Sequence, residues 1–350
     1  MTQSIADKIA QDFTKFLNDW HSAPEVYDDA LDAQIHRWYT DILSDKSRKV
    51  WPARNVPYFS PSAANADPRS LYEKMRGAKK ENNGQPAFQG RWTRIGTAIG
   101  DTIQRDILFA EQHYARYYGE NPEFGFVRND RGEPMFEDFA KVNKIVEHNG
   151  AVFALFGTCD GIMRVFVPEL GRTIRVGLEI KSKQTTYSQT SEYSTRKGPK
   201  EDHVKQCVTY SAMYGTAAEP VDYYIILYVN ASKKSWAMTP EEFEKNPDIA
   251  AFGLHITDEM RAEVLDHFAG IVKAAEAGTP PALDLDKWTF NNFKRACALS
   301  LSSDEIAELE RQVSALQRSS LPDWKKRGPA EALAEIYRIR TESEIAKEVA

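Results

Sequence analysis

Hydrophobic side chains in the first fifty residues recur at helical spacing and form two separate series. One series of isoleucine, phenylalanine and tryptophan runs from Ile5 to Trp20, and the second runs from Leu31 to Ile42. A period of three to four residues places each series on one face of a helix. Pro24 separates them, because proline cannot donate the amide hydrogen that a helix interior requires. The pattern predicts two packed helices without catalytic groups.

A longer helical pattern covers residues 94–118. Its apolar stripe consists of isoleucines at every fourth position, namely Ile95, Ile99, Ile103 and Ile107. Gly96 and Gly100 lie inside the pattern, although glycine destabilises a helix interior by about 1 kcal/mol relative to alanine. We interpret these glycines as a close approach to another part of the backbone. The polar segment 121–132 ends the helix.

Shorter apolar runs with glycine between them predict strands at 151–159, 163–167 and 173–181. Residues 201–214 follow as a helix, and the nearly continuous apolar run 222–230 predicts a strand buried on both faces. After Pro281 the pattern is helical again, with Ser302 and Glu305 spaced as a capping box. We therefore divide the chain into a helical N-terminal extension (1–50), an α/β core (51–280) and a helical C-terminal extension (281–350).

Composition narrows the class of protein. The chain has 350 residues and 42% hydrophobic content, which suits a globular core. Three widely spaced cysteines do not indicate a disulfide framework. The sequence contains no apolar run of membrane-spanning length, and its first twenty residues do not resemble a signal peptide. These features predict a cytoplasmic protein without a membrane partner.

The net charge of −6 disfavours nucleic-acid binding, but the charge is unevenly distributed. Segment 181–205 carries six lysines and arginines against three acids. Its polar part, 185–198, includes Tyr187 and Tyr193. We expect the loop 185–200 to be poorly ordered without nucleic acid and to become ordered on binding it, since tyrosines can stack on bases. A solvated loop with scattered charge is an equally good explanation of the charges alone.

The richest chemistry lies on the predicted central strands. Asp160 precedes a glycine turn, and Glu179 and Lys181 alternate with Leu178 and Ile180, so both project from one face of their strand. Two carboxylates and a lysine on neighbouring strands are the groups needed to hold a hard divalent cation beside a phosphodiester. Taken singly, Asp160 would also suit a turn, and Glu179 with Lys181 an ion pair.

An acid, Glu-x-Lys and a helical Gln-x-x-x-Tyr, here Gln206 and Tyr210, occur in that order. Over residues 58–236 this combination resembles the PD-(D/E)xK nuclease superfamily, and within it the RecB-type branch that includes phage recombination exonucleases. The resemblance implies an α/β, restriction-endonuclease-like core of order αβββαβ, with a mixed central sheet flanked by helices.

The resemblance also implies roles for individual residues. Asp160, Glu179 and the carbonyl of Ile180 would bind Mg²⁺ or Mn²⁺, and Lys181 would orient water and stabilise charge on the phosphate. Gln206 and Tyr210 would complete the catalytic set. The residues expected to bind substrate are Gln104, Lys183, Tyr187, Arg196, Lys197, Lys200, His203 and Lys205.

Two departures from the branch are visible. Its first core helix usually carries Gly-x-x-x-His, whereas here Gly96 is followed by Gly100, so the histidine ligand is absent. Glu111, Gln104 or Asp101 would have to replace it, and a salt bridge is an equally good role for Glu111. Some relatives also hold an iron–sulfur cluster with four cysteines, which three cysteines exclude.

The pattern favours a Mg²⁺- or Mn²⁺-dependent deoxyribonuclease, an exonuclease of recombination or end processing that acts on DNA with a free end. The chain lacks a nucleotide-binding P-loop, so ATP-driven unwinding would need another protein. A recombination partner protein and a homo-oligomer both stay open. Two alternatives remain, a catalytically silent DNA-binding or assembly module and an endonuclease.

Overall fold

A mixed sheet of five strands forms the centre of the protein in the computed structural model, which describes residues 2–82, 84–233 and 235–348. The strand order is β2-β5-β6-β7-β8, with β6 and β7 parallel and the other neighbours antiparallel. Its strands are β2 (Phe124–Phe126), β5 (Gly161–Val167), β6 (Arg172–Lys183), β7 (Tyr223–Asn230) and β8 (Ile249–His255). As its apolar run predicts, β7 is buried on both faces.

A second, smaller sheet has the order β1-β4-β3. It comprises β1 (Tyr58–Phe59), β3 (Val142–His148) and β4 (Ala151–Gly157). The strand predicted at 151–159 therefore exists as β4 but belongs to this sheet. Its expected place in the central sheet is taken by β2, inside the segment interpreted only as a helix break. Three residues are too few to show an alternating pattern in the sequence.

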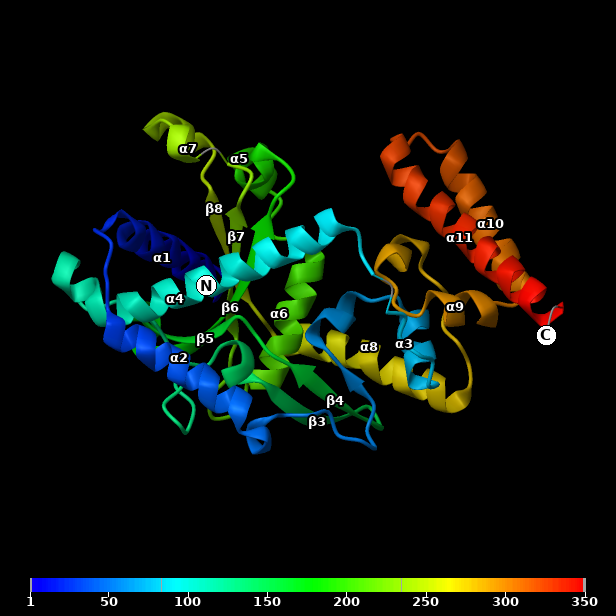
Figure 1. The fold of residues 1–350 in the computed structure, drawn as a ribbon, viewed down its shortest axis with the longest axis horizontal. Helices are drawn as coiled ribbons and strands as arrows, with labels where there is room; N and C mark the ends of the chain where they lie inside the picture. The colour runs from blue at the N-terminus through cyan, green and yellow to red at the C-terminus, as the bar shows by residue number, and fades with distance from the viewer. Residues whose placement is uncertain (1, 83, 234, 349–350) are drawn as a thin grey trace.

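Helices cover both faces of the central sheet (Figure 1). The helices are α1 (Thr2–Ser22), α2 (Asp29–Ser44), α3 (Pro68–Met75), α4 (Ala87–Tyr118), α5 (Glu192–Thr195), α6 (Glu201–Tyr214), α7 (Pro240–Lys245), α8 (Asp258–Ala277), α9 (Lys294–Ser300), α10 (Ser303–Arg318) and α11 (Asp323–Glu348). The order α4, β2, β5, β6, α6, β7 confirms the predicted αβββαβ fold class. The β3–β4 hairpin is inserted between its first two strands.

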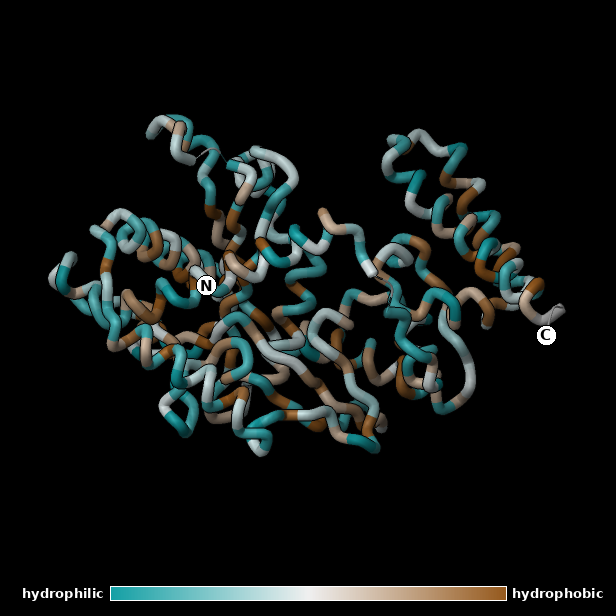
Figure 2. Tube along the Cα trace, viewed as in Figure 1, coloured by the Kyte–Doolittle hydropathy of each residue, from teal (hydrophilic) through white to brown (hydrophobic). Residues whose placement is uncertain are grey.

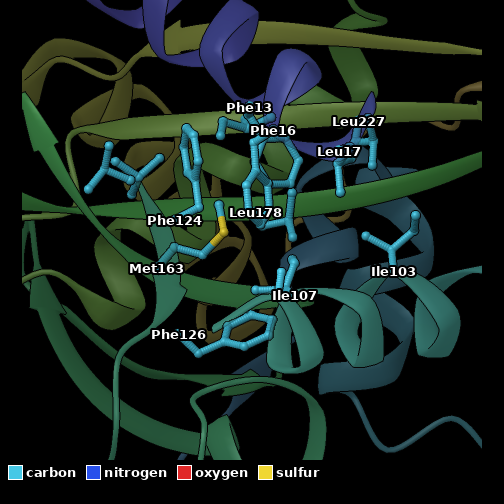
Figure 3. Close-up of a cluster of buried hydrophobic side chains, with 14 of the residues drawn as sticks. Phe13, Phe16, Leu17, Ile103, Ile107, Phe124, Phe126, Met163, Leu178 and Leu227 are labelled. Carbon is cyan, nitrogen blue, oxygen red and sulfur yellow. The ribbon is translucent and has the colours of Figure 1, made fainter. Parts of the chain in front are cut away.

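Each face of the sheet has its own hydrophobic core. On one face α1 and α4 pack against β5, β6 and β7, and Figure 3 shows Phe13 and Phe16 of α1 gathered with Phe124 and Leu178 of the strands. On the other face α6 and α8 pack against β4 and β7. Because α1 and α2 share the core of the sheet, the predicted boundary at residue 50 does not separate two cores.

The long helix α4 leaves the body of the protein at its N-terminal half. Ile103 and Ile107 are buried, but Ile95 of the same stripe is 48% exposed. Gly96 passes close to β6, since a Cβ placed on it would lie 3.1 Å from Ser182 Oγ. The neighbours of Gly96 are side chains rather than the backbone that was predicted, and nothing lies within 4 Å of a Cβ at Gly100.

The C-terminal helices have a hydrophobic core of their own. Leu285, Trp288, Ile306 and Ile336 are among the members of a third hydrophobic core, distinct from the two beside the sheet. Helices α10 and α11 form a hairpin that projects away from the strands, with its hydrophobic segments along the inner side (Figure 1, Figure 2). The predicted capping box of Ser302 is present. Among the described helices, none has the length and apolar character needed to cross a membrane.

Candidate active site

Asp160 and Glu179 face each other across two antiparallel strands. The register pairs Gly161 with Leu178, which places Asp160, immediately before β5, opposite Glu179 of β6. The backbone amide of Ile180 donates a hydrogen bond of 2.6 Å to Asp160 Oδ2. This bond fixes one carboxylate oxygen of Asp160 and leaves the other for a ligand. The sequence-predicted pair is therefore brought together by strand pairing.

Glu179 is almost completely enclosed, with 1% of its surface exposed. Its Oε1 forms an ion pair with the Lys181 ammonium, while its Oε2 is buried and has no hydrogen-bond partner among the described residues. Burial, and then the nearby Glu137 carboxylate, raise the pKa of Glu179. Burial and the Glu179 carboxylate likewise raise the pKa of Asp160. Two buried carboxylates that repel each other are a site prepared for positive charge.

Lys181 is held by a short chain of polar groups from α6. Its ammonium donates a hydrogen bond of 3.1 Å to Gln206 Oε1, and Gln206 Nε2 donates one of 3.1 Å to the Tyr210 hydroxyl. Gln206 and Tyr210 are one helical turn apart, so both point to the same side of α6. Burial alone would lower the pKa of Lys181, but the Glu179 and Asp160 carboxylates outweigh it and raise the pKa.

Helix α4 contributes Gln104, which is 1% exposed. Gln104 Nε2 donates a hydrogen bond of 2.9 Å to the Asp160 carbonyl oxygen, and Gln104 Oε1 is buried without a partner. It is one of the three residues considered in the sequence analysis as a replacement for the absent histidine ligand. The structure therefore sets Gln104 beside the acidic pair.

Glu137 is a site residue that the sequence did not reveal. It lies in a 3₁₀ turn before β3 and has a left-handed φ of 45°, a conformation that favours glycine and costs about 1–3 kcal/mol elsewhere. Its amide donates a hydrogen bond of 2.9 Å to the Cys159 carbonyl oxygen, which positions it beside Asp160. Burial, and then the Asp160 charge, raise the pKa of Glu137 to about 7. Its neighbours are distant in sequence, so no local pattern indicates this placement.

The donor set fits a divalent metal that retains water ligands. Within the described residues, histidine, cysteine, aspartate and glutamate do not by themselves form a metal-binding group of three or more. Mg²⁺, however, is commonly bound by one or two carboxylates together with several waters. The partnerless Oε2 of Glu179 and Oε1 of Gln104 are oxygen donors of the required kind, and Asp160 supplies a second carboxylate.

Next to the acidic pair lies a group of basic residues from β6 and from α6 with its N-cap. Lys183 follows Lys181 on the same face of β6, is 7% exposed, and places its ammonium 3.6 Å from the ring centroid of Tyr228. His203 Nδ1 lies 2.7 Å from the Tyr228 hydroxyl, which also accepts a hydrogen bond of 2.9 Å from the Lys200 amide. Among the described residues Lys183 has no carboxylate within ion-pair distance.

Burial and the neighbouring lysines lower the pKa values of Lys183 and His203. Burial, and then Lys200 and Lys181, lower the pKa of Lys183 to about 8. Burial and the same lysines, together with Lys183, lower the pKa of His203 to about 3, so His203 is neutral at pH 7. We call Lys181, Lys183, Lys200 and the neutral His203 the lysine group, and its three lysines create a local positive potential beside two carboxylates.

Two residues predicted for the site lie elsewhere. Glu111 accepts a hydrogen bond of 2.5 Å from the Phe126 amide and pairs with Arg128, so its carboxylate is engaged at the end of β2. Lys205 pairs with Glu201 at 2.7 Å and lines a different cavity together with His267, whose pKa is lowered by burial and then by Lys205. The salt-bridge alternative for Glu111 therefore agrees with the structure better than a metal role does.

The loop after β6 is folded rather than open. It forms a 3₁₀ turn at Tyr187–Thr190 and helix α5, and Asn230 Nδ2 donates hydrogen bonds to the carbonyl oxygens of Thr186 and Tyr187. The expectation that nucleic acid orders this loop stays a prediction. Tyr187, Arg196 and Lys197 are exposed on this loop. The cysteines at 159 and 207 are free and buried, as expected for small apolar side chains.

Comparison with known proteins gives only distant similarities. No family model and no curated protein matches the sequence. Among solved structures, the protein SSO0001 shares 13% identity with a TM-score of 0.37, covering 77% of this chain and 98% of that one. An alkaline exonuclease (LHK-Exo) from Laribacter hongkongensis shares 13% identity with a TM-score of 0.33, and the match covers 63% of this chain and 89% of that one. A phage related exonuclease from Haemophilus somnus 129PT shares 14% identity with a TM-score of 0.26, and the match covers 61% of this chain and 93% of that one.

Proposed function

We propose that this protein is a metal-dependent nuclease that hydrolyses phosphodiester bonds at Asp160, Glu179 and Lys181. The observation that carries the proposal is the buried Glu179 Oε2, which has no partner while it faces a second carboxylate. A buried carboxylate oxygen without a partner is costly unless a ligand satisfies it. The lysine group next to it supplies the positive charge that a phosphodiester requires.

The residues divide the chemistry among themselves. A Mg²⁺ or Mn²⁺ ion held by Asp160, Glu179, the Ile180 carbonyl and Gln104 would stabilise charge on the phosphate and acidify a bound water. Lys181, kept in place by Gln206, would donate a hydrogen bond to the phosphate oxygen as charge develops there. Glu137, which lies beside Asp160 and has a pKa of about 7, would accept the proton that the attacking water loses.

We propose DNA as the substrate, with its strand passing along the lysine group and the N-terminal half of α4. That half exposes Phe88 at 65% and Trp92 at 48%, and Gln184 Nε2 donates a hydrogen bond of 3.2 Å to the Trp92 carbonyl oxygen. Exposed aromatic rings beside cations suit bases and phosphates of a single strand. Exonuclease action at a free end, a role in recombination, and a partner protein or homo-oligomer belong to the same proposal.

The direct test is digestion of matched linear and closed circular DNA with Mg²⁺, with Mn²⁺ and with a chelator. Metal-dependent loss of linear DNA with survival of the circle supports an exonuclease. Loss of both forms indicates an endonuclease. Survival of both with every metal rejects the nuclease, and DNA binding without cleavage then indicates a silent module. The missing histidine ligand, the acidic net charge and the ion pair of Lys181 with Glu179 favour the silent module.

Lys183→Met is expected to weaken binding of a single-stranded oligonucleotide and to remove part of its pH dependence. The pKa of Lys183 is lowered to about 8, so wild-type protein should lose this charge, and affinity with it, as pH rises from 7 to 9.5. The variant lacks the charge at every pH. The oligonucleotide affinity of both proteins is measured by fluorescence anisotropy over this pH range, at constant salt and with a chelator present.

The matched control for this experiment is Lys205→Met, whose ammonium pairs with Glu201 outside the lysine group. It should keep the wild-type pH dependence. Equal pH profiles for wild-type and Lys183→Met would show that Lys183 does not contact the strand.

A further inference from the structure

A cavity of about 550 Å³ lies at the end of the central sheet where β6 and β7 begin, away from the acidic pair. Its walls come from β5, β6, the residues after β2, and the segment between α6 and β7. The cavity is rich in positive charge. Its charged residues are the arginines Arg128, Arg164, Arg172 and Arg175 and the acids Glu219 and Asp222.

The acids near the cavity do not neutralise all four arginines. Arg128 pairs with Glu111, and Arg175 pairs with Glu219 at 3.2 Å. Arg164 and Arg172 have neither an ion pair nor a side-chain hydrogen bond within residues 2–82, 84–233 and 235–348. The remaining acid, Asp222, does not neutralise Arg164 or Arg172, because it is paired with Arg261 of α8.

Two of the arginines are placed where their charges repel. Arg164 and Arg175 are direct partners in the β5–β6 ladder and project from the same face of the sheet. Residues directly opposite in an antiparallel pair have Cβ atoms about 4.5–5.5 Å apart, and like charges there are destabilising. A bound anion would remove this repulsion, and guanidinium groups match the oxygens of a phosphate in pairs.

The same face of the sheet is uncovered at this end. Toward the acidic pair it is closed by Tyr224, whose ring occupies the space where a Cβ of Gly177 would lie. Beyond that point Phe166 of β5 is 58% exposed, two residues from Arg164 on the same side of its strand. An aromatic ring beside guanidinium groups suits a nucleic-acid strand, whose bases stack while its phosphates pair.

We propose that this arginine cavity, with Phe166, is a second binding site for phosphate groups, and that its occupant is a single nucleic-acid strand. The proposal rests on the proposed action on nucleic acid. Arg175 and Glu179 are four residues apart on one face of β6, which corresponds to about 13 Å. Tyr224 closes the face between these two residues, so a strand bound at both sites would have to follow a longer path around it, whereas a free phosphate in the cavity would not contact Glu179.

The test compares wild-type protein with the double variant Arg164→Gln/Arg172→Gln. Binding of a labelled single-stranded oligonucleotide is measured by anisotropy over a range of salt, with a chelator present so that nothing is cleaved. We expect roughly tenfold weaker binding and a salt slope smaller by about 1.4, because each lost phosphate contact on a single strand accounts for about 0.7.

Matched variants control for charge and folding. Arg338→Gln on α11 removes an exposed arginine at the other end of the molecule, and it should change neither affinity nor slope (Figure 1). Arg164→Lys/Arg172→Lys keeps the positive charge but loses the planar guanidinium that bonds two phosphate oxygens at once. It should therefore restore the salt slope and only part of the affinity. If the glutamine double variant behaves like Arg338→Gln, the site does not exist.

Two further arms identify the occupant. Phe166→Leu should weaken oligonucleotide binding several-fold and leave calorimetric binding of inorganic pyrophosphate unchanged, while the arginine variant should lose both. Loss of pyrophosphate binding alone would overturn the strand as occupant and leave a site for free phosphate. Because no arm requires cleavage, failure of the proposed nuclease reaction would not affect these results.

Discussion

Glu179→Gln is expected to abolish cleavage and to weaken Mg²⁺ and Mn²⁺ binding by more than about 100-fold, beyond the loss seen when only an outer hydrogen-bond partner of a metal ligand is removed. The substitution keeps the volume of the side chain but replaces the buried, partnerless oxygen with a neutral amide. Metal binding is measured by calorimetry, and cleavage by single-turnover digestion of linear DNA.

The melting temperature of the metal-free protein separates a metal ligand from a structural ion pair. Burial raises the pKa of Glu179 in the folded state above its value in the unfolded chain. The ionised carboxylate therefore costs stability above its unfolded pKa of about 4.3, and this cost grows with pH until the raised pKa is passed. We expect the metal-free variant to melt at or above the wild-type temperature at pH 7.

Two results, if observed together, would contradict the assignment of Glu179 as a metal ligand. A lower melting temperature without metal, together with unchanged metal affinity, would make Glu179 the ion-pair partner of Lys181 and nothing more. Glu169→Gln, an exposed glutamate after β5, is the matched control and should leave melting, metal binding and cleavage unchanged.

The alternation of Glu179 and Lys181 along a strand was enough to predict that both side chains share a face, because strand geometry has a fixed period. The same holds for Gln206 and Tyr210 on α6, where helical geometry sets the spacing. Asp160 required one further step, the antiparallel pairing of β5 with β6, and the glycine turn near it made that step predictable.

Other parts of the site depend on contacts that no local pattern encodes. Glu137 reaches Asp160 through a left-handed turn and a hydrogen bond to Cys159, and both depend on the inserted β3–β4 hairpin. The arginine cavity likewise arises only when Arg164 and Arg175 meet in register. In the sequence these residues are isolated charges, and isolated charges are usually solvated.

Lys181→Ala is expected to reduce the single-turnover cleavage rate by about 10²- to 10³-fold, the loss typical of removing one donor that stabilises transition-state charge. Metal and DNA affinity should change little, because Asp160 and Glu179 still hold the cation and the other members of the lysine group still face the strand. An interaction that strengthens only in the transition state lowers the rate without lowering affinity.

Lys181→Arg should restore only part of the rate. The guanidinium is wider than the ammonium, and the position beside Glu179 and Gln206 is shaped for a compact group that is 27% exposed. Lys205→Ala is the matched control, since it removes a lysine that also pairs with a glutamate, and it should keep the wild-type rate.

The melting temperature of Lys181→Ala with and without metal separates its catalytic role from its role as an ion-pair partner. Removing its ammonium leaves the buried Glu179 carboxylate uncompensated, so the metal-free Lys181→Ala variant should melt below wild type. A bound divalent cation supplies the missing positive charge, so saturating Mg²⁺ should recover most of this difference while the slow rate remains. If Lys181 acts only as an ion-pair partner, the folded variant will instead cleave at the wild-type rate per molecule, and the catalytic role of Lys181 will be rejected.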